Sequence, residues 1–431
     1  MQVLPITRNA VEQERSSFAP ATALTANEPT TCCIVGGGPA GAVLSLLLAR
    51  QGIPITLLEA HKDFERDFRG DTIHPSVLEI MDDLGLADRL LELPHAKIRT
   101  ISLQTPAGRL QIADFGRLRT RYPFVCMMPQ ARFLDFITSE ARRYSSFRLV
   151  MGANVNELIM DTGVVRGVRY HRGRQGLCEV RALLTVAADG RFSRLRKLAG
   201  FEPVKTSPPI DVLWFRLPRC PDDPQDSGEA FVGRGHFLIL LDRSEEWQVA
   251  WVIPKDGFQE LRAAGLETLR QTIVEAVPHF ADRVQHLRDW KQVSLLSVES
   301  NRLPQWYGPG LLLIGDAAHV MSPVAGVGIN YAIQDAVVAA NVLAGPLKAG
   351  EARLEDLAAV QRQREWPTRI IQAFQSAAQD QIVARVLDQD TPFKIPIILR
   401  LILRVPLLRD LPARLLGLGI RRVHVRNDSK G

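Results

Sequence analysis

The alternation of hydrophobic and polar residues first becomes regular near residue 31, where an apolar strand is expected over residues 31–35. A glycine cluster follows, and then a helical pattern over residues 40–50 that ends at Gly52, a residue type that readily adopts the left-handed conformation of a helix end. A second strand is expected over residues 55–58 and leads directly into Glu59. This strand–turn–helix–strand unit is typical of the opening of a nucleotide-binding α/β domain.

The pattern then predicts a mixture of helices and strands up to about residue 187. Residues 76–93 and 130–144 have apolar positions at helical spacing, whereas residues 98–125 alternate around Pro106 and Gly108 as in a β-hairpin. Further strands are expected near residues 147–150, 155–159, 164–170 and 177–187.

The pattern of apolar and polar residues changes between about residues 205 and 292. Extended segments are followed there by a helical stretch over residues 258–285, which predicts an inserted β-rich domain that could form a second wall over a ligand. The strand-and-helix pattern of the nucleotide-binding domain resumes with an apolar strand at residues 310–314 and a long helix over residues 328–344. This helix is expected to stop at Gly345–Pro346. The last 55 or so residues are helical in character, and Pro396, Pro406 and Pro412 within residues 392–420 favour short packed helices over a membrane-surface helix.

Composition and charge narrow the class of protein. The 431 residues include 53 Lys and Arg against 47 Asp and Glu, and this excess of positive charge is spread along the chain, which fits anionic ligands better than nucleic acid. The five cysteines are scattered, with Cys32 and Cys33 expected as buried small side chains, and no metal site is predicted. Residues 1–30 resemble a tail without a signal-peptide core, no bilayer-spanning run is expected, and the predicted location is the cytoplasm.

The first chemical motif is the turn Gly36-Gly37-Gly38-Pro39-Ala40-Gly41, which has the G-x-G-x-x-G spacing. Gly36 permits the tight turn, Gly38 lets the backbone approach a pyrophosphate, and Gly41 allows close packing of the helix on the strand. The start of the helix at Pro39 and Ala40 offers N–H groups to phosphates, and Glu59 is placed to accept hydrogen bonds from ribose hydroxyls. This motif alone leaves FAD and NAD open.

Two later motifs favour FAD. The apolar strand at residues 310–314 runs into Gly315-Asp316, where a carboxylate can bind a polyol hydroxyl. A loop of small residues then leads into the long helix, and its backbone N–H groups could stabilise negative charge on a reduced flavin. The residues of this loop expected to contact the cofactor are Pro323, Gly326, Gly328, Ile329 and Asn330.

Together with Asp189-Gly190-x-x-Ser193-x-x-Arg196, these motifs resemble those of the class A flavoprotein monooxygenases, the p-hydroxybenzoate hydroxylase group, over roughly residues 31–345. The resemblance implies an α/β fold with an FAD-binding Rossmann-like domain, an interleaved β-rich substrate domain and a C-terminal helical segment. It places the FAD-binding domain at residues 31–97, 121–205 and 293–375, the substrate domain at 98–120 and 206–292, and the helical segment at 376–431.

The resemblance also implies roles for individual residues. Glu59 would bind the adenosine ribose, Asp316 the ribityl chain, and the loop from Pro323 to Asn330 the isoalloxazine ring. Asp189 would lie near the pyrophosphate, with a part in NAD(P)H binding. Further positions that contact FAD in relatives are matched here by Arg69, Gln130 and Val155.

The activity implied by the resemblance is oxygen insertion with NAD(P)H and O₂ through a C4a-hydroperoxyflavin, and the apolar strands of the insert favour an aromatic or polycyclic small-molecule substrate. Asp71 and His74 lie in the segment that passes the flavin in relatives and are candidates to orient substrate or shuttle a proton. Alternatively, Asp71 caps the following turn and His74 is a satisfied buried residue. His319 is expected to be structural.

Three other functions stay open. A flavin-dependent reductase of the geranylgeranyl-reductase type shares the fold and several motifs. Trp247-Gln-Val-Ala-Trp251-Val-Ile-Pro254 partly resembles the W-x-W-x-I-P signature of flavin-dependent halogenases, but Val249 stands where the first Trp belongs. The third alternative is a flavoprotein that binds a ligand without turnover.

Overall fold

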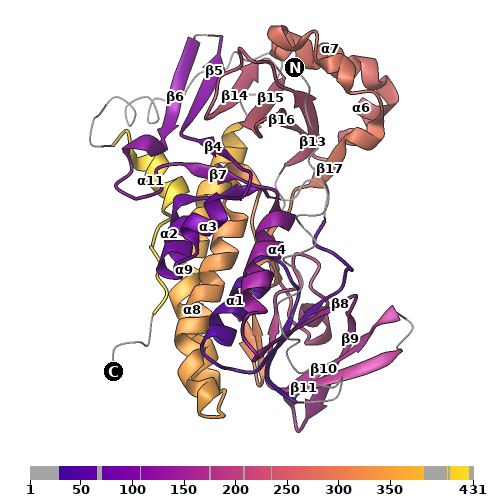
Figure 1. Cartoon of the computed structure of the whole chain (residues 1–431). Coiled ribbons are helices and arrows are strands. Elements are labelled where there is room, and N and C mark those ends of the chain that lie inside the picture. Colours follow the sequence, from indigo (N-terminus) through magenta and orange to yellow (C-terminus); the bar gives the residue numbers. More distant parts are fainter. Residues whose placement is uncertain are drawn as a thin grey trace, which may run out of the picture.

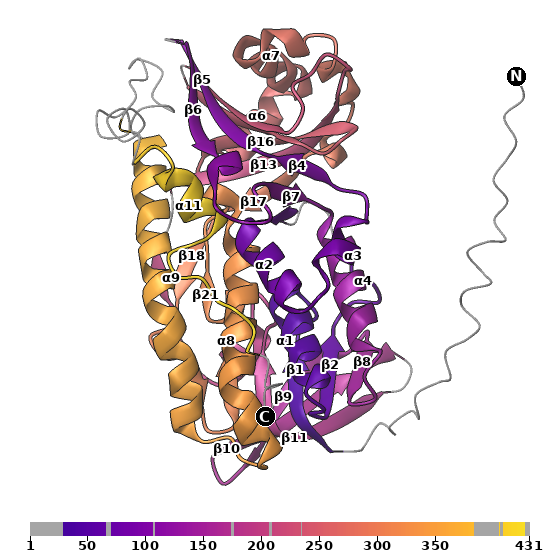
Figure 2. The same ribbon diagram turned by 60° about the vertical axis from the view of Figure 1, so that its left-hand side comes forward.

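The computed structural model describes residues 29–65, 70–106, 108–173, 176–206, 209–233, 235–382, 405 and 408–426. Most of the predicted N-terminal tail, Arg69 and much of the proline-interrupted C-terminal segment lie outside these residues. Figures 1 and 2 show a β-sheet lobe topped by α6 and α7, and a second lobe in which the long helices α8 and α9 run beside α1.

The nucleotide-binding unit is built on a sheet of predominantly parallel strands in the order β19-β20-β11-β1-β2-β8. The pairings of β20, β11, β1, β2 and β8 are parallel, and β19 is antiparallel to β20. The strands span Thr30–Val35 (β1), Ile55–Glu59 (β2), Phe147–Met151 (β8), Leu177–Ala187 (β11), Tyr307–Gly308 (β19) and Leu311–Leu313 (β20). An antiparallel extension of β11 is formed by β9 (Asn154–Asp161) and β10 (Val164–His171). The predicted strands of this region are therefore confirmed.

Four helices form the apolar core of this unit. They are α1 (Pro39–Arg50), α4 (Gln130–Ala141), α8 (Gly328–Lys348) and α9 (Leu354–Ile382). Helix α1 packs on α8 and α4, and α8 packs on α9. Residues 324–348 are long and apolar enough to cross a membrane by length and composition, but 78% of the most apolar window is buried in this core.

The predicted stop of the long helix at Gly345–Pro346 is wrong, because α8 continues through Pro346 to Lys348. A proline in the last turn removes only one backbone hydrogen bond, the one to the carbonyl of Val342, so the helix can end two residues later. The single helix predicted over residues 76–93 is also divided. Gly85, with a φ of +71°, separates α2 (Pro75–Asp83) from α3 (Ala87–Leu91).

The lobe topped by α6 and α7 contains a seven-stranded sheet in the order β17-β13-β16-β15-β14-β5-β6. The predicted hairpin is confirmed as β5 (Thr100–Thr105) and β6 (Gly108–Asp114), and β5 pairs with β14 of the inserted block. Two segments far apart in sequence thus share one sheet. The other strands span Ile210–Pro218 (β13), Ser227–Gly233 (β14), His236–Asp242 (β15), Glu246–Pro254 (β16) and Ser294–Ser297 (β17).

One face of this sheet is covered by α6 (Phe258–Ala264) and α7 (Leu266–Ala276). A three-stranded sheet in the order β3-β7-β4 lies between the two lobes (Figure 2). The remaining elements are β3 (Thr72–Ile73), β4 (Ala96–Ile98), β7 (Val125–Met127), α5 (Arg194–Leu198), β12 (Val204–Thr206), β18 (Ser300–Arg302), β21 (His319–Val320) and α11 (Leu411–Gly417). Short 3-10 turns lie at Phe115–Arg117, Pro278–Phe280, Val284–His286, Trp290–Gln292, Gly315–Ala317 and Val324–Gly326.

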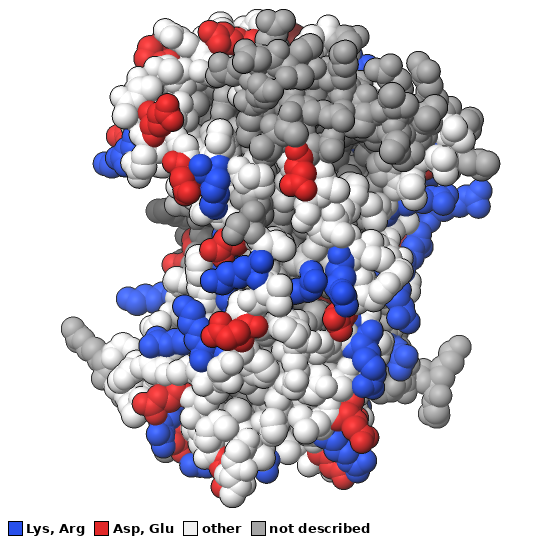
Figure 3. Space-filling view, turned by 180° about the vertical axis from the view of Figure 1, so that it is seen from behind, with Lys and Arg blue, Asp and Glu red and all other residues white. Residues whose placement is uncertain are grey.

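Charge and cysteine placement follow the sequence prediction. Basic and acidic side chains are interspersed over the described surface seen in Figure 3. Cys32 and Cys33 are fully buried, and all five cysteines are free thiols.

Candidate FAD site

The carboxyl ends of three neighbouring strands bring the predicted motifs to one edge of the parallel sheet. Val35 of β1 is in register with Ala187 of β11, and Ala187 with Leu313 of β20. The residues that follow these three positions are the glycine turn, Asp189 and the Gly315-Asp316 step. In open α/β sheets this edge is where ligands bind.

The glycines of the first turn have different environments. Gly36 has a φ of +104°, and a Cβ there would lie 2.3 Å from the carbonyl oxygen of Ala188. A Cβ on Gly41 would lie 1.9 Å from the carbonyl oxygen of Gly36. A Cβ on Gly38, in contrast, would meet no atom within 4 Å. Gly36 and Gly41 are therefore required by packing, whereas Gly38 faces open space at the N-terminus of α1, which has no side-chain cap.

Glu59 lies directly beside this turn. Its carboxylate accepts hydrogen bonds from the backbone N–H groups of Gly37, at 2.7 Å, and His61, at 3.0 Å. The N–H of Ala153 donates to the carbonyl oxygen of Glu59, so Val155 lies two residues from this contact, at the start of β9, where its side chain is buried. The chain thus brings Val155 to within two residues of a backbone bond to Glu59.

The Gly315-Asp316 step contacts both flanking helices. Gly315 has a φ of +59°, and a Cβ there would approach the methyl groups of Ala332 in α8 and Ala40 in α1 to 3.2 and 3.4 Å. The buried guanidinium of Arg196 donates to the carbonyl oxygen of Ala317 at 3.1 Å. Arg196 therefore connects the Asp189–Arg196 motif to the Gly315-Asp316 step.

Asp189 is bound within its own motif. Its carboxylate accepts hydrogen bonds from the Ser193 hydroxyl and from the backbone N–H groups of Arg194 and Leu195, at the start of α5. Burial raises the pKa of Asp189, and these hydrogen bonds oppose that rise. A role at the pyrophosphate remains a prediction for this residue.

The small-residue loop before α8 lies against the segment that contains Asp71 and His74. The side-chain oxygen of Asn330 accepts a hydrogen bond from the backbone N–H of His74 at 2.9 Å. The Thr72 hydroxyl donates to the carbonyl oxygen of Gly326 at 2.9 Å, and a Cβ on Gly70 would lie 3.0 Å from Ile329. The predicted site residues Gly326, Ile329 and Asn330 are thus brought against the segment that contains His74, which lies more than 250 positions earlier in the sequence.

His74 is buried and its Nδ1 lies 2.6 Å from the carbonyl oxygen of Leu416 in α11. Because this oxygen can only accept, Nδ1 carries the proton. Burial lowers the pKa of His74 to about 4, and the bond to Leu416 only partly offsets that effect. The geometry matches the interpretation of His74 as a satisfied buried residue.

Asp71 joins the two lobes. One carboxylate oxygen accepts from the backbone N–H of Gln130 at 3.2 Å, and the other lies 2.9 Å from the guanidinium of Arg243, which follows β15. Burial raises the pKa of Asp71, and Arg243 opposes the rise. Asp71 therefore binds the start of α4, 59 residues further along the chain, instead of capping the turn that follows it, and it also forms an ion pair between lobes.

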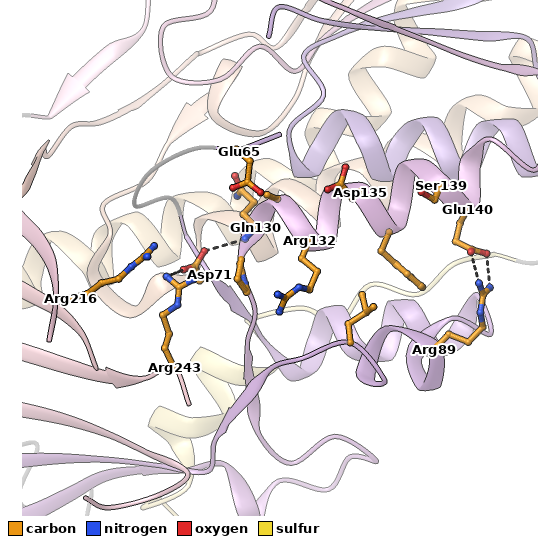
Figure 4. Close-up of a pocket in the computed structure, with 14 residues that line it drawn as sticks. Glu65, Asp71, Arg89, Gln130, Arg132, Asp135, Ser139, Glu140, Arg216 and Arg243 are labelled. Carbon is orange, nitrogen blue, oxygen red and sulfur yellow. Dashed lines mark hydrogen bonds and ion pairs between the residues drawn. The ribbon is translucent and has the colours of Figure 1, made fainter. Parts of the chain in front are cut away.

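A cavity of about 600 Å³ opens beside this ion pair. Figure 4 shows Arg216, Arg243 and Arg132 on its walls near Asp71 and Gln130, with the Arg89–Glu140 ion pair at the far end. Helix α4 thus supplies most of the lining, with Arg89 of α3 at one end and with Arg216 of β13 and Arg243 after β15 at the other.

Comparison with known proteins agrees with this geometry. A family described as FAD binding domain matches residues 29–372. The chain belongs to this family.

The relatives are FAD-dependent monooxygenases of the class A type, and this chain is an enzyme of that kind. It is 35% identical to 6-methylpretetramide 4-monooxygenase of Streptomyces rimosus, over 80% of this chain and 84% of that protein. It is 26% identical to 3-demethoxyubiquinol 3-hydroxylase of Escherichia coli, over 76% and 82%. Among solved structures, p-nitrophenol 4-monooxygenase PnpA from Pseudomonas putida has the same fold, with a TM-score of 0.73 at 18% identity over 92% of this chain and all of that one.

The residues present fit FAD. The uncapped N-terminus of α1, the open space at Gly38 and the carboxylates of Glu59 and Asp316 all lie at the carboxyl edge of the sheet. Glu59 and the N-terminus of α1 would hold the adenosine diphosphate part, and Asp316 with loop 323–330 the flavin part. Of the other predicted contacts, Gln130 lies next to Asp71, and Arg69 is outside the described residues.

Sequence reasoning missed a buried ionic cluster under the Gly315-Asp316 step. The carboxylate of Asp335 in α8 accepts from the backbone N–H of Gly315 at 3.0 Å, from His319 at 2.6 Å and from Arg364 of α9 at 2.7 Å. Burial alone would raise the pKa of Asp335, but the charges and hydrogen bonds of His319 and Arg364 hold it below its ordinary value. His319 is thus structural, as predicted, and its signal in the sequence was its place three residues after Asp316.

Proposed function

We propose that this monooxygenase uses NAD(P)H and O₂ to hydroxylate or epoxidise an apolar aromatic or polycyclic small molecule. The observation that carries the proposal is the face of the seven-stranded sheet that α6 and α7 leave uncovered. Strand register places Val212 opposite Val252 and Trp214 opposite Ala250, and Phe237 and Ile239 of β15 extend the same face.

This face is apolar over most of its width. Trp214, Phe237 and Ile239 are only half-buried, so they offer aromatic and aliphatic surface to a ligand. Apolar surface of this kind favours a flat hydrophobic substrate, since each 100 Å² removed from water contributes about 2–3 kcal/mol. Two proteins that this chain resembles, 6-methylpretetramide 4-monooxygenase and anhydrotetracycline hydroxylase, are named for the compounds they oxygenate, which supports a substrate of that aromatic class.

The polar end of the same face supports the choice of NAD(P)H as hydride donor. Arg216 and Gln248 are paired across β13 and β16, and Arg243 donates to Gln248. Arg216 and Arg243 line the cavity, together with Arg132 and Gln130. Guanidinium groups bind phosphate oxygens well. The phosphate groups of NAD(P)H could therefore bind here while it delivers hydride.

FAD, when bound, accepts hydride from the nicotinamide and activates O₂; the protein supplies position, charge and a dry site. The N-terminus of α1 and Glu59 bind the adenosine end, and the backbone of loop 323–330 stabilises negative charge at the flavin. The apolar sheet face holds the substrate and excludes water. His74 takes no proton at neutral pH, because burial holds its pKa at about 4.

The decisive experiment supplies the holoenzyme with NADH or NADPH, ¹⁸O₂ and a panel of polycyclic phenols and quinones. The proposal expects substrate to accelerate NAD(P)H oxidation and the product to gain one ¹⁸O atom. Label arriving from water, or a product with a reduced double bond and no added oxygen, would overturn it in favour of a reductase. If no compound of the panel accelerates NAD(P)H oxidation, the result would favour a flavoprotein that binds such compounds without converting them.

We also propose that the enzyme works in the cytoplasm, supported by its five free cysteines. Fractionation of the source cells followed by detection of the chain tests this location.

A further inference from the structure

Helix α9 buries a stripe of polar side chains. Its members lie three or four residues apart and so share one face of the helix. They are Gln361, Arg364, Thr368, Gln372, Gln375 and Gln379, all buried. Helices usually bury an apolar stripe, so a polar one needs partners.

The glutamines of this stripe bind backbone atoms of two segments that lead to the flavin loop. Gln361 accepts from the N–H of Trp306 at 2.9 Å and donates to the carbonyl oxygen of Pro304 at 2.8 Å. Gln372 donates to the carbonyl oxygens of Asn301 and Val320, at 2.9 and 3.0 Å. Each amide thus replaces a backbone partner that the irregular segments lack.

The last two glutamines reach the loop itself. The amide of Gln375 donates to the carbonyl oxygens of Ser322 and Val324, at 2.9 and 2.7 Å, and that of Gln379 donates to the Ser322 hydroxyl at 2.5 Å. The loop needs such support because Ala325 has a φ of +71°, a left-handed conformation that costs a residue with a Cβ about 1 kcal/mol or more. Conformations of this kind persist where surrounding contacts hold them.

The opposite side of the loop is held by other elements. The carbonyl oxygen of Gly326 accepts from the Thr72 hydroxyl and from the side-chain amide of Asn330. The loop is therefore clamped between α9 on one side and β3 with α8 on the other. Among the described residues outside the loop, the side chains that bind the residues just before the left-handed Ala325 come from α9.

We propose that Gln375 and Gln379 are positioning residues that fix the backbone of residues 322–326 for flavin binding. The backbone N–H groups of this loop are the groups expected to face the flavin, and their direction depends on how the carbonyl groups of the same peptides are held. Loss of the Gln375 bonds lets the peptides after Ser322 and Val324 rotate. The flavin then loses part of its binding energy and of the electrostatic stabilisation of its reduced form.

A pair of matched variants tests this inference. Gln375→Met removes two bonds to the loop, and Gln361→Met removes two bonds of the same helix stripe far from the loop. Both replacements keep the length of the side chain but leave buried backbone groups without their hydrogen-bond partners. Both should therefore lower the melting temperature of the FAD-free protein. The FAD dissociation constant, measured by titrating the FAD-free protein, should rise at least tenfold for Gln375→Met and stay within twofold for Gln361→Met.

A second readout separates positioning from loss of stability. The midpoint potential of the bound flavin should become more negative in Gln375→Met and be unchanged in Gln361→Met. Equal weakening of FAD binding by the two variants, or an unchanged dissociation constant in Gln375→Met, would overturn the inference. If Gln375→Met does not fold, Gln379→Met carries the test, with an expected three- to fivefold rise. These measurements need neither substrate nor NAD(P)H, so they stand apart from the proposed oxygenation.

Discussion

His74 shows how the surroundings of one residue set a pH dependence. Its pKa is lowered to about 4 by burial in the folded protein, against an ordinary value of 6.5. The unfolded chain therefore binds a proton that the folded chain does not between these values. Stability from the neutral imidazole is complete above pH 6.5 and is lost as the pH falls towards 4, by about 1.4 kcal/mol per pH unit.

The variant His74→Asn should remove this slope. In urea unfolding, the free energy of unfolding of the wild type should fall by about 2 kcal/mol more than that of the variant between pH 6.5 and pH 5. Between pH 7 and pH 8 the two proteins should run parallel. Identical slopes at acidic pH would mean that His74 is protonated in the folded state.

Asp316 is the second residue whose contribution can be isolated. Asp316→Ala should weaken FAD binding by about 10- to 100-fold, because hydrogen bonds to a charged group contribute about 1.5–3 kcal/mol. The melting temperature of the FAD-free protein should change little. The control Asp161→Ala removes an exposed carboxylate at the end of β9; an unchanged FAD dissociation constant in Asp316→Ala, equal to that of the control, would show that the ribityl chain lies elsewhere.

At the scale of elements, the first turn separates glycines needed for packing from one needed for a ligand. Gly41→Ala would force a Cβ to 1.9 Å from the Gly36 oxygen and should destabilise the FAD-free protein by about 1–3 kcal/mol or more. Gly38→Ala meets no protein atom, so the FAD-free protein should melt normally while FAD binding weakens at least tenfold. Melting curves and FAD titrations of both variants distinguish the two roles. Normal FAD affinity in Gly38→Ala would contradict a pyrophosphate at this turn.

Elements with a regular apolar period were predictable, and their irregular ends were not. The strands of the parallel sheet were placed correctly because buried strands read as continuous apolar runs. The stop at Pro346 was misplaced because a proline near a helix end costs only one hydrogen bond. The division at Gly85 depends on how α2 and α3 pack. The helical spacing of apolar residues over 76–93 contains no information on that packing.

At the scale of the whole molecule, the ion pair of Asp71 and Arg243 is a charged contact across the lobes. Its side chains are mostly buried, 8% and 14% exposed. Removing one partner leaves the other buried without compensation, which costs about 3–5 kcal/mol. Arg243→Met should therefore lower the free energy of unfolding by that order, measured in urea, and Arg121→Met, which breaks an exposed pair with Asp88, should leave it nearly unchanged.

The double variant Arg243→Met with Asp71→Asn supplies a check. It should be more stable than Arg243→Met alone, because the uncompensated carboxylate is gone. A double variant less stable than the single one would show that Asp71 contributes mainly through Gln130.

The candidate site was predictable as far as its residues follow a motif along the chain. Glu59, Asp189 and Asp316 occupy the sheet edge that their spacing indicated. Arg243 and Gln375 were not predictable, since each reaches the site from a distant element and neither belongs to a local pattern. Asp335 lay within the predicted helix, but only the three-dimensional contacts with Gly315 and Arg364 give it a role.

Helix α9 turns the six polar residues of its stripe inward, while Trp366 and Phe374 are 61% and 42% exposed. A helical wheel drawn from residue type alone would therefore misplace these eight side chains. For protein engineering, this reverses the usual advice: the aromatic positions can be made hydrophilic to improve solubility at little cost, and the glutamines should be left alone. A library that randomises polar residues of α9 as if they were surface would lose most of its folded members.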